Sequence, residues 1–194
     1  MGLLGKGETM SEYILELNGI TKIFPGVKAL DNVQFKLKKG EIHALMGENG
    51  AGKSTFIKVI TGVHQPESGE ILINGQKVVF KDPKDAYKMS IAAIYQHGTA
   101  YQHLSVTENI FMGHEKIKKS GLINWKQMHK EAKALLTRLG SNIDPTSIMG
   151  NLTVAEQQIV EIAKAISTNA QIIIMDEPTA ALSKRECEEL YRIT

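Results

Sequence analysis

Residues 47–54 read GENGAGKS, in which a glycine is followed by four residues and then by Gly-Lys-Ser. The apolar run at 42–46 before this stretch is expected to be a strand, and residues 55–61 after it are expected to be a helix. Glycines allow a tight turn whose N–H groups point inward, and the helix directs the positive end of its dipole to the same place. The stretch therefore predicts a phosphate-binding loop, with a glycine-rich turn carrying an incidental lysine as the alternative.

The polar side chains of this P-loop have distinct expected tasks. Lys53 is expected to contact the β- and γ-phosphates of a nucleotide and is a candidate catalytic residue, while the Ser54 hydroxyl is expected to bind Mg²⁺. The candidate nucleotide-binding residues are Gly47, Glu48, Asn49, Gly50, Ala51, Gly52, Lys53, Ser54 and Thr55.

Two adjacent carboxylates follow a second apolar run, IIIM at 172–175. A buried strand that ends in Asp176 and Glu177, in a chain with a P-loop, indicates a Walker B element. Asp176 is expected to hold Mg²⁺, and Glu177 is the candidate catalytic base that orients and deprotonates the attacking water. The alternative is that both acids only solvate the end of a strand.

The pattern along the rest of the chain predicts an α/β fold with three subregions. Short, largely alternating segments predict a small antiparallel sheet, and they lie at 13–17, 33–37, 70–73 and 77–80, with an Asn74-Gly75 turn between the last two. Nearly continuous apolar runs predict parallel strands covered on both faces, and they lie at 42–46, 91–95 and 172–175. A helical region of about 98–169 separates the second and third of these runs.

Two helices are expected within that region. Asn124 is a candidate N-cap of the first helix and Gly140 is expected to end it. Its apolar positions share one face and are Trp125, Met128, Ala132, Leu135, Leu136 and Leu139. The second helix is expected to begin near Thr153, with apolar positions at Ile159, Ile162, Ala163 and Ile166.

Composition excludes several classes of protein. The 194 residues are 42% hydrophobic and carry a formal net charge of +2, which gives no electrostatic reason to expect nucleic acid as a partner. The single cysteine, Cys187, excludes a disulfide framework, and the six histidines lack metal-ligand spacing. No apolar run approaches the roughly 20 residues that span a bilayer. Lys116, Lys118 and Lys119 are interpreted as a solvated loop, with contact to lipid headgroups as the alternative.

The N-terminal residues 1–10 are interpreted as a disordered leader. Residues 1–9 are glycine-rich without a continuous apolar stretch, so they do not match a secretory signal, and Met10 is a candidate natural start. A cytoplasmic protein is therefore expected.

Three further segments resemble the ATP-binding-cassette (ABC) transporter ATPases. They are IYQH at 94–97, NLTVAEQQ at 151–158 and DEPTAALS at 176–183, which correspond to the Q-loop, the signature motif, and Walker B with the D-loop. Three more segments resemble the monosaccharide-importer branch of this family, of ribose, galactose and arabinose type. They are FPGVKAL at 24–30, LSVTENIFMG at 104–113 and VEIAKA at 160–165. The resemblance covers about 13–194.

The resemblance implies a fold and further site residues. The fold is a P-loop NTPase cassette over 11–194, with a RecA-like parallel core, a small antiparallel β subdomain and a helical subdomain at about 98–169. Phe24 would stack on adenine, with a core phenylalanine as the alternative. Gln96 would reach Mg²⁺ or the attacking water and sense the membrane subunit, with an ordinary strand-end glutamine as the alternative.

The signature segment departs from the family pattern Leu-Ser-Gly-Gly-Gln at Thr153, Val154, Ala155 and Glu156. In the family these positions bind the γ-phosphate held by a second cassette. The same residues also read as a capping box, Thr-x-x-Glu, which would occur merely to start a helix. A carboxylate at Glu156 is expected to repel phosphate, and Ser183 replaces the D-loop aspartate of many family members.

The resemblance implies an ATPase that binds ATP and Mg²⁺ and powers import of a monosaccharide through a membrane permease. Its expected partners are a second ABC cassette, the permease subunits and, indirectly, an extracytoplasmic sugar-binding protein, at the inner face of the membrane. The alternatives are a soluble cassette of translation or DNA maintenance and a non-hydrolysing nucleotide-binding cassette. Since no histidine follows the Walker B strand, the sequence is interpreted as an N-terminal piece, incomplete at its C-terminus, that hydrolyses little ATP alone.

Overall fold

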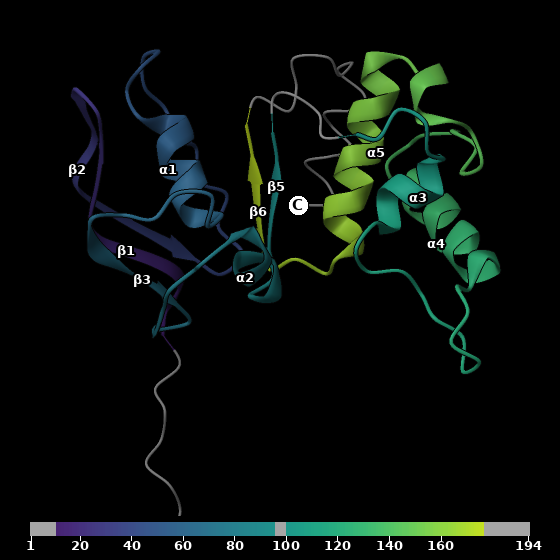
Figure 1. Cartoon of the computed structure of the whole chain (residues 1–194), viewed down its shortest axis with the longest axis horizontal. Coiled ribbons are helices and arrows are strands. Elements are labelled where there is room, and N and C mark those ends of the chain that lie inside the picture. Colours follow the sequence, from purple (N-terminus) through teal and green to yellow (C-terminus); the bar gives the residue numbers. More distant parts are fainter. Residues whose placement is uncertain (1–10, 96–99, 177–194) are drawn as a thin grey trace, which may run out of the picture. The chain divides into compact units, whose positions relative to one another are not determined.

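The chain divides into two compact units, Met1–Met89 and Ser90–Thr194, called here the first and second unit (Figure 1). The computed structural model describes residues 11–95 and 100–176. The predicted leader at 1–10 lies outside the described residues, and so do Gln96, Glu177 and Ser183.

The first unit carries a four-stranded antiparallel sheet with the strand order β2-β1-β3-β4. Its strands are β1 (Tyr13–Phe24), β2 (Val27–Lys38), β3 (Ser68–Ile73) and β4 (Gln76–Val78). Asn74 and Gly75 join the last two with φ of 50° and 78°, as a type I′ hairpin requires. The predicted antiparallel sheet is confirmed, although β1 and β2 are longer than the sequence pattern indicated.

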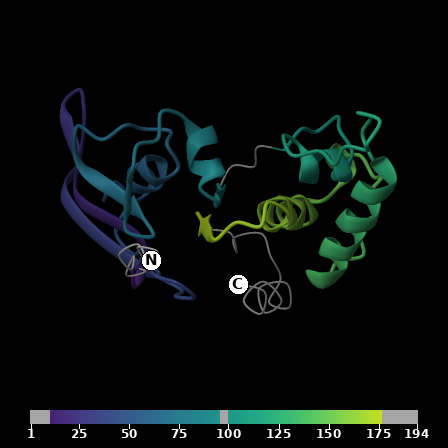
Figure 2. The ribbon, with the colours of Figure 1, turned by 90° about the horizontal axis from the view of Figure 1, so that it is seen from below.

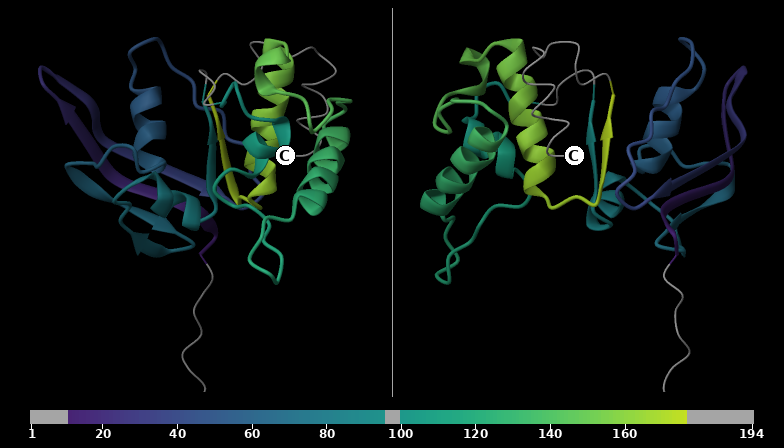
Figure 3. Two further views of the ribbon diagram at one scale, coloured as in Figure 1. Left: turned by 45° about the vertical axis from the view of Figure 1, so that its right-hand side comes forward. Right: turned by 180° about the vertical axis from the view of Figure 1, so that it is seen from behind.

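Two helices accompany this sheet (Figure 3). Helix α1 (Lys53–Ile60) buries Phe56, whose ring meets Phe35 of β2 edge to face at 5.2 Å between centroids. Helix α2 (Pro83–Lys88) begins after Asp82, whose carboxylate accepts the Lys84 N–H at 2.8 Å. The aromatic contact fixes the helix that follows the P-loop onto the sheet.

The second unit contains a parallel strand pair, β5 (Ile91–Ile94) and β6 (Ile172–Met175). Ile91 pairs with Ile172 and Ile94 pairs with Met175, so both strands end at the same edge. The predicted parallel pairing of these two apolar runs is confirmed, although three of the four residues of β6 are only half-buried.

Helices α3 (Val106–Phe111), α4 (Trp125–Arg138) and α5 (Val154–Ser167), with a short 3₁₀ turn at Met149–Asn151, pack together in the second unit (Figures 1 and 2). Their shared core continues onto Ala92 and Ile94 of β5. Its fully buried helical side chains include Val106, Ile110, Met128, Ala132, Leu136 and Ala163.

Helix α4 follows the predicted pattern with one exception. Asn124 caps it by accepting the Gln127 N–H, and Gly140, with φ of 73°, ends it while the Ser141 N–H bonds the Leu136 carbonyl at 2.9 Å. Trp125, predicted on the buried face, is 42% exposed and stacks on His129. Trp125 is the first residue of the helix, and the buried residues of α4 begin only at Met128.

The prediction of a buried strand at 42–46 is wrong. Residues 41–48 form no strand, and Ile42 and Met46 are 74% and 88% exposed. A strand exists only where a neighbour completes its hydrogen bonds, and neither sheet of the described residues contributes one to this segment. Apolar composition therefore indicated strand propensity here but could not supply the partner.

We expect Leu136→Ala to lower the free energy of unfolding by about 2–5 kcal/mol, because it removes a fully buried side chain from the core of the second unit. Urea unfolding would measure the loss. Thr137→Ala, the exposed neighbour on the same helix, should change stability by less than about 0.5 kcal/mol. Equal effects of the two variants would contradict this packing.

Candidate nucleotide-binding site

The P-loop leads directly into α1, which begins at Lys53. No side chain within the described residues caps this helix, and its first turn carries no acidic residue. The other described helices, α2 to α5, each begin with a side chain that accepts a backbone N–H. The start of α1 therefore keeps unsatisfied donors and positive dipole charge for an anion.

Gly52 shapes the junction between loop and helix. It has φ of 88°, and a Cβ built on it would stand 2.5 Å from the Ala29 carbonyl oxygen and 3.1 Å from a Leu30 methyl. Only glycine accommodates both the left-handed backbone and this close approach to β2. The loop is thus held against β2 at Ala29 and Leu30, near the start of that strand.

The Lys53 side chain folds back along the loop. Its ammonium donates to the carbonyl oxygens of Gly47 at 2.6 Å and Glu48 at 2.9 Å. An ionised phosphate oxygen is a stronger acceptor than a carbonyl, so an ammonium held at this place is suited to bind one. The Ser54 hydroxyl on the first turn of α1 is exposed.

Phe24 ends β1 at the hairpin that leads into β2, where it pairs with Val27. Its half-buried ring contacts the His64 ring edge to face at 5.2 Å, and the Lys22 ammonium lies 5.4 Å from its centroid. Phe24 and the P-loop both belong to the first unit, joined through β2.

Asp176 belongs to the second unit and directly follows β6. Its N–H donates to the Ile94 carbonyl at 2.9 Å, which extends the ladder with β5 and fixes the backbone from which the half-buried carboxylate projects. Gln96 and Glu177 each follow one of these two strands in sequence and lie outside the described residues.

A magnesium ion that accompanies a nucleotide typically takes one or two protein oxygens together with phosphate oxygens. The Ser54 hydroxyl and the Asp176 carboxylate are hard oxygen donors of the type this ion prefers. No group of three or more His, Cys, Asp or Glu side chains able to hold a metal occurs in the described part of the chain. Each of the two side chains, taken separately, is therefore of a type that fits nucleotide-bound Mg²⁺.

The capping box predicted at the start of α5 is present. The Thr153 hydroxyl accepts the Glu156 N–H at 3.3 Å, while the Glu156 carboxylate accepts the Thr153 N–H at 2.8 Å and its hydroxyl at 2.9 Å. A carboxylate therefore lies at this helix start. Val154, next in the segment, is 71% exposed, and Ala155 is half-buried.

Helix α3 begins with a matching box that sequence reasoning missed. The Ser105 N–H donates to Glu108 at 2.7 Å and the Ser105 hydroxyl at 2.6 Å. These hydrogen bonds, led by that of the hydroxyl, hold the pKa of Glu108 below its ordinary value. The Ser-x-x-Glu spacing at 105–108 was the available signal.

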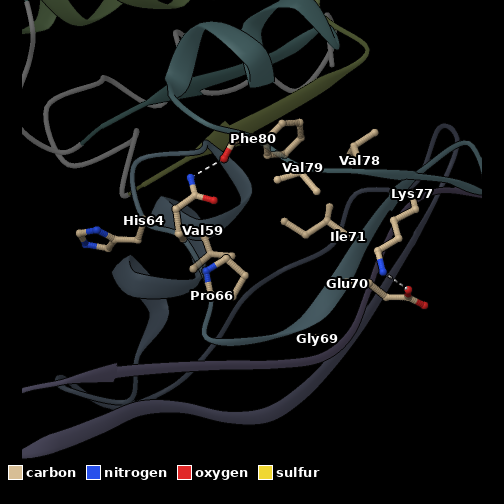
Figure 4. A pocket seen from close by; sticks show the side chains of 11 residues that line it. Val59, His64, Pro66, Gly69, Glu70, Ile71, Lys77, Val78, Val79 and Phe80 are labelled. Carbon is tan, nitrogen blue, oxygen red and sulfur yellow. Dashed lines mark hydrogen bonds and ion pairs between the residues drawn. The ribbon is translucent and has the colours of Figure 1, made fainter.

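A separate pocket of about 160 Å³ lies in the first unit (Figure 4). Apolar side chains, among them Val59 and Ile71, line it together with an ion pair of 3.2 Å between Lys77 and Glu70. The Gln65 amide donates to the Phe80 carbonyl beside it. None of its lining residues is a predicted site residue.

Comparison with known proteins gives a consistent set of relatives. A family model described as ABC transporter matches residues 30–180. The chain is 51% identical over 180 residues to "Ribose import ATP-binding protein RbsA 2" of Rhizobium johnstonii, covering 93% of this chain and 35% of that protein. It is 52% identical over 186 residues to "Xylose import ATP-binding protein XylG" of Thermoanaerobacter pseudethanolicus, covering 95% and 37%. The chain thus spans about a third of the length of these relatives.

Solved structures agree with these sequence relatives. A nucleotide-free ATP-binding cassette from an ABC transporter matches with a TM-score of 0.76 and 27% identity, over 93% of this chain and 75% of that one. A dimeric bacterial ABC transporter cassette, MJ0796, matches with a TM-score of 0.79 and 26% identity, over 92% and 80%.

We expect Gly52→Ala to weaken MgATP binding by about tenfold or more, because the added methyl pushes the P-loop off β2 and strains a left-handed backbone. Titration of the full-length protein with a fluorescent ATP analogue would measure the affinity. Gly40→Ala is the matched control, since Gly40 also has a positive φ, 75°, yet a Cβ there meets no atom within 4 Å. If Gly52→Ala binds MgATP with unchanged affinity, the close approach of Gly52 to β2 does not determine the shape of the binding loop.

Proposed function

The chain belongs to the ABC transporter family and has the P-loop NTPase fold of its ATP-binding cassette, and from that premise we propose that it is the ATP-binding and ATP-hydrolysing component of a monosaccharide importer. The observation that carries the proposal is the uncapped start of α1, next to the ammonium of Lys53 on a loop closed by Gly52. The relatives named for ribose import and xylose import support the transport role and the sugar class.

In this proposal the first unit binds the nucleotide. The N–H groups at the start of α1 and the Lys53 ammonium bind the β- and γ-phosphates, and Phe24 offers its ring to adenine. Ser54, Asp176 and Gln96 are the residues that would hold Mg²⁺, whose charge would offset that of the phosphates. Glu177 would accept a proton from the attacking water as the water oxygen bonds to the γ-phosphorus and the bond from that phosphorus to the β,γ-bridging oxygen breaks, which leaves ADP and inorganic phosphate.

The second unit contributes a half-site to a partner cassette. Thr153, Val154, Ala155 and Glu156 at the start of α5 would face the γ-phosphate bound on the other cassette. The similarity to a cassette solved as a dimer supports the pairing of two cassettes. Because Thr153 and Glu156 already satisfy each other's N–H groups, the half-site attracts phosphate less strongly than the start of α1.

The remaining partners follow from an import function. A membrane permease would receive the motion of cassette closure, and an extracytoplasmic sugar-binding protein would act through that permease. Within the described residues no helix has the length and apolar character to cross a bilayer. We infer from the import functions of the relatives that the protein works at the inner face of the membrane.

A non-hydrolysing cassette is the second candidate, and the carboxylate of Glu156 at the half-site favours it. The presence of Glu177 after the Walker B strand favours hydrolysis. The relatives support sugar import over the soluble cassettes of translation or DNA maintenance.

We expect Glu177→Gln to lower ATP turnover by roughly 10²-fold while ATP stays bound, because the amide cannot accept the proton of the attacking water. Phosphate release and retained nucleotide would be measured in the transporter assembled from the full-length protein. Lys53→Ala provides the contrast, since it should lose retained ATP together with turnover. Normal turnover by Glu177→Gln would refute its role as base.

We expect Glu156→Gln to lower the KM for ATP about fivefold. Glutamine preserves the capping box but removes a negative charge from the half-site, and a charge at a helix start changes a binding free energy by up to about 1 kcal/mol, which corresponds to about fivefold in affinity. Steady-state hydrolysis by the assembled transporter would measure it. Glu108→Gln is the matched control, since it alters the same type of box on α3, outside the proposed half-site. If both variants shift KM equally, Glu156 does not face the nucleotide.

A further inference from the structure

Asn109 is a buried polar residue on α3, 3% exposed, that no part of the proposed function uses. Its side-chain oxygen accepts the Tyr101 N–H at 2.8 Å, and its amide nitrogen donates to the Tyr101 carbonyl at 3.1 Å. The same nitrogen lies 3.0 Å from the Ser105 carbonyl and 3.4 Å from that of Leu104. One side chain thus holds both ends of the segment 101–105.

The segment 101–105 lies beside the segment 148–152, which leads into α5 (Figure 1). The Met149 N–H donates to the Leu104 carbonyl at 2.9 Å, and the Gly150 N–H donates to the Gln102 carbonyl at 2.9 Å. An isolated antiparallel bridge joins Ser105 to Ile148. The two segments are therefore one hydrogen-bonded unit.

The connection continues into α5 itself. The Gln102 amide donates to the Gln157 side-chain oxygen at 3.3 Å, and the Gln157 amide donates to the Leu152 carbonyl at 3.0 Å. Thr153, which begins α5, follows directly. The segments also approach closely, since a Cβ on Gly150 would stand 3.0 Å from the Gln102 carbonyl oxygen.

We propose that Asn109 is a positioning residue for ATP hydrolysis, which fixes the start of α5 by holding the segment 101–105 against the segment 148–152. The inference rests on the proposed function of the α5 half-site. Asn109 touches no nucleotide in this account and acts through the place it gives to the backbone of Thr153. An amide is suited to this task because its oxygen accepts the Tyr101 N–H while its nitrogen donates to the carbonyls of Tyr101 and Ser105.

Asn109→Asp tests the proposal, since it keeps the shape of the side chain but replaces donors with a group that repels the Tyr101 and Ser105 carbonyls. Amide hydrogen exchange of the full-length protein should rise about tenfold or more at 101–104 and at 149–153, as expected for loss of buried hydrogen bonds. In the assembled transporter kcat should fall about tenfold, while the affinity of the P-loop for MgATP stays within about twofold.

Two further variants separate positioning from general destabilisation. Met128→Ala removes a buried side chain of α4, which lies outside both segments in sequence, from the same core, so it should lower stability but leave kcat unchanged. Gly150→Ala leaves Asn109 intact but requires the Gln102 carbonyl, 3.0 Å from the added Cβ, to give way. It should therefore lower kcat in the same direction, and it replaces Asn109→Asp as the test if that variant does not fold.

The outcomes are distinct. A fall in kcat for Asn109→Asp and Gly150→Ala, but not for Met128→Ala, supports the proposal. An equal fall for Met128→Ala, or faster exchange that stops at 101–104, overturns it. If the unmodified transporter hydrolyses no ATP, the proposed function fails, whereas the exchange at 149–153 still decides whether Asn109 positions the start of α5.

Discussion

The first backbone N–H groups of a helix have no hydrogen-bond partner within the helix and need an acceptor from elsewhere. This requirement distinguishes α1 from the other described α-helices. Among the described α-helices, α2 to α5 meet it with their own side chains, through Asp82, Ser105, Asn124 and Thr153. Helix α1 meets it with none, because Gly52 precedes it and no acidic residue lies in its first turn. The open helix start is the one preceded by the glycine-rich loop, so the same local sequence creates both the need for an anion and the space for it.

The start of α5 leaves fewer backbone N–H donors for an anion than the start of α1 does. Its capping box stabilises the helix by about 0.5–2 kcal/mol in ordinary cases, and in doing so it occupies donors that a phosphate would otherwise use. Under the proposed function this helix start would attract phosphate less strongly than the start of α1, and it would meet a nucleotide only when a second cassette brings one.

How much the sequence could predict depends on how local each feature is. The P-loop, the Asn74-Gly75 hairpin and the helix from Asn124 to Gly140 depend on contacts within a few residues, and the structure has them. The run at 42–46 needed a partner strand that composition cannot supply, and it forms no strand. Asn109 was missed because its bonds reach a segment without regular structure, although a polar residue among the apolar positions of α3 was a usable signal.

The exposed run at 42–46 also affects how the protein behaves at high concentration. Residues 42–46 read IHALM, contain no charge and no proline, and expose Ile42, Leu45 and Met46 to solvent. Segments of this kind pair readily with extended backbone from another molecule. The run ends where the glycine-rich loop begins, so pairing of 42–46 with another molecule would restrict the backbone that leads directly into that loop.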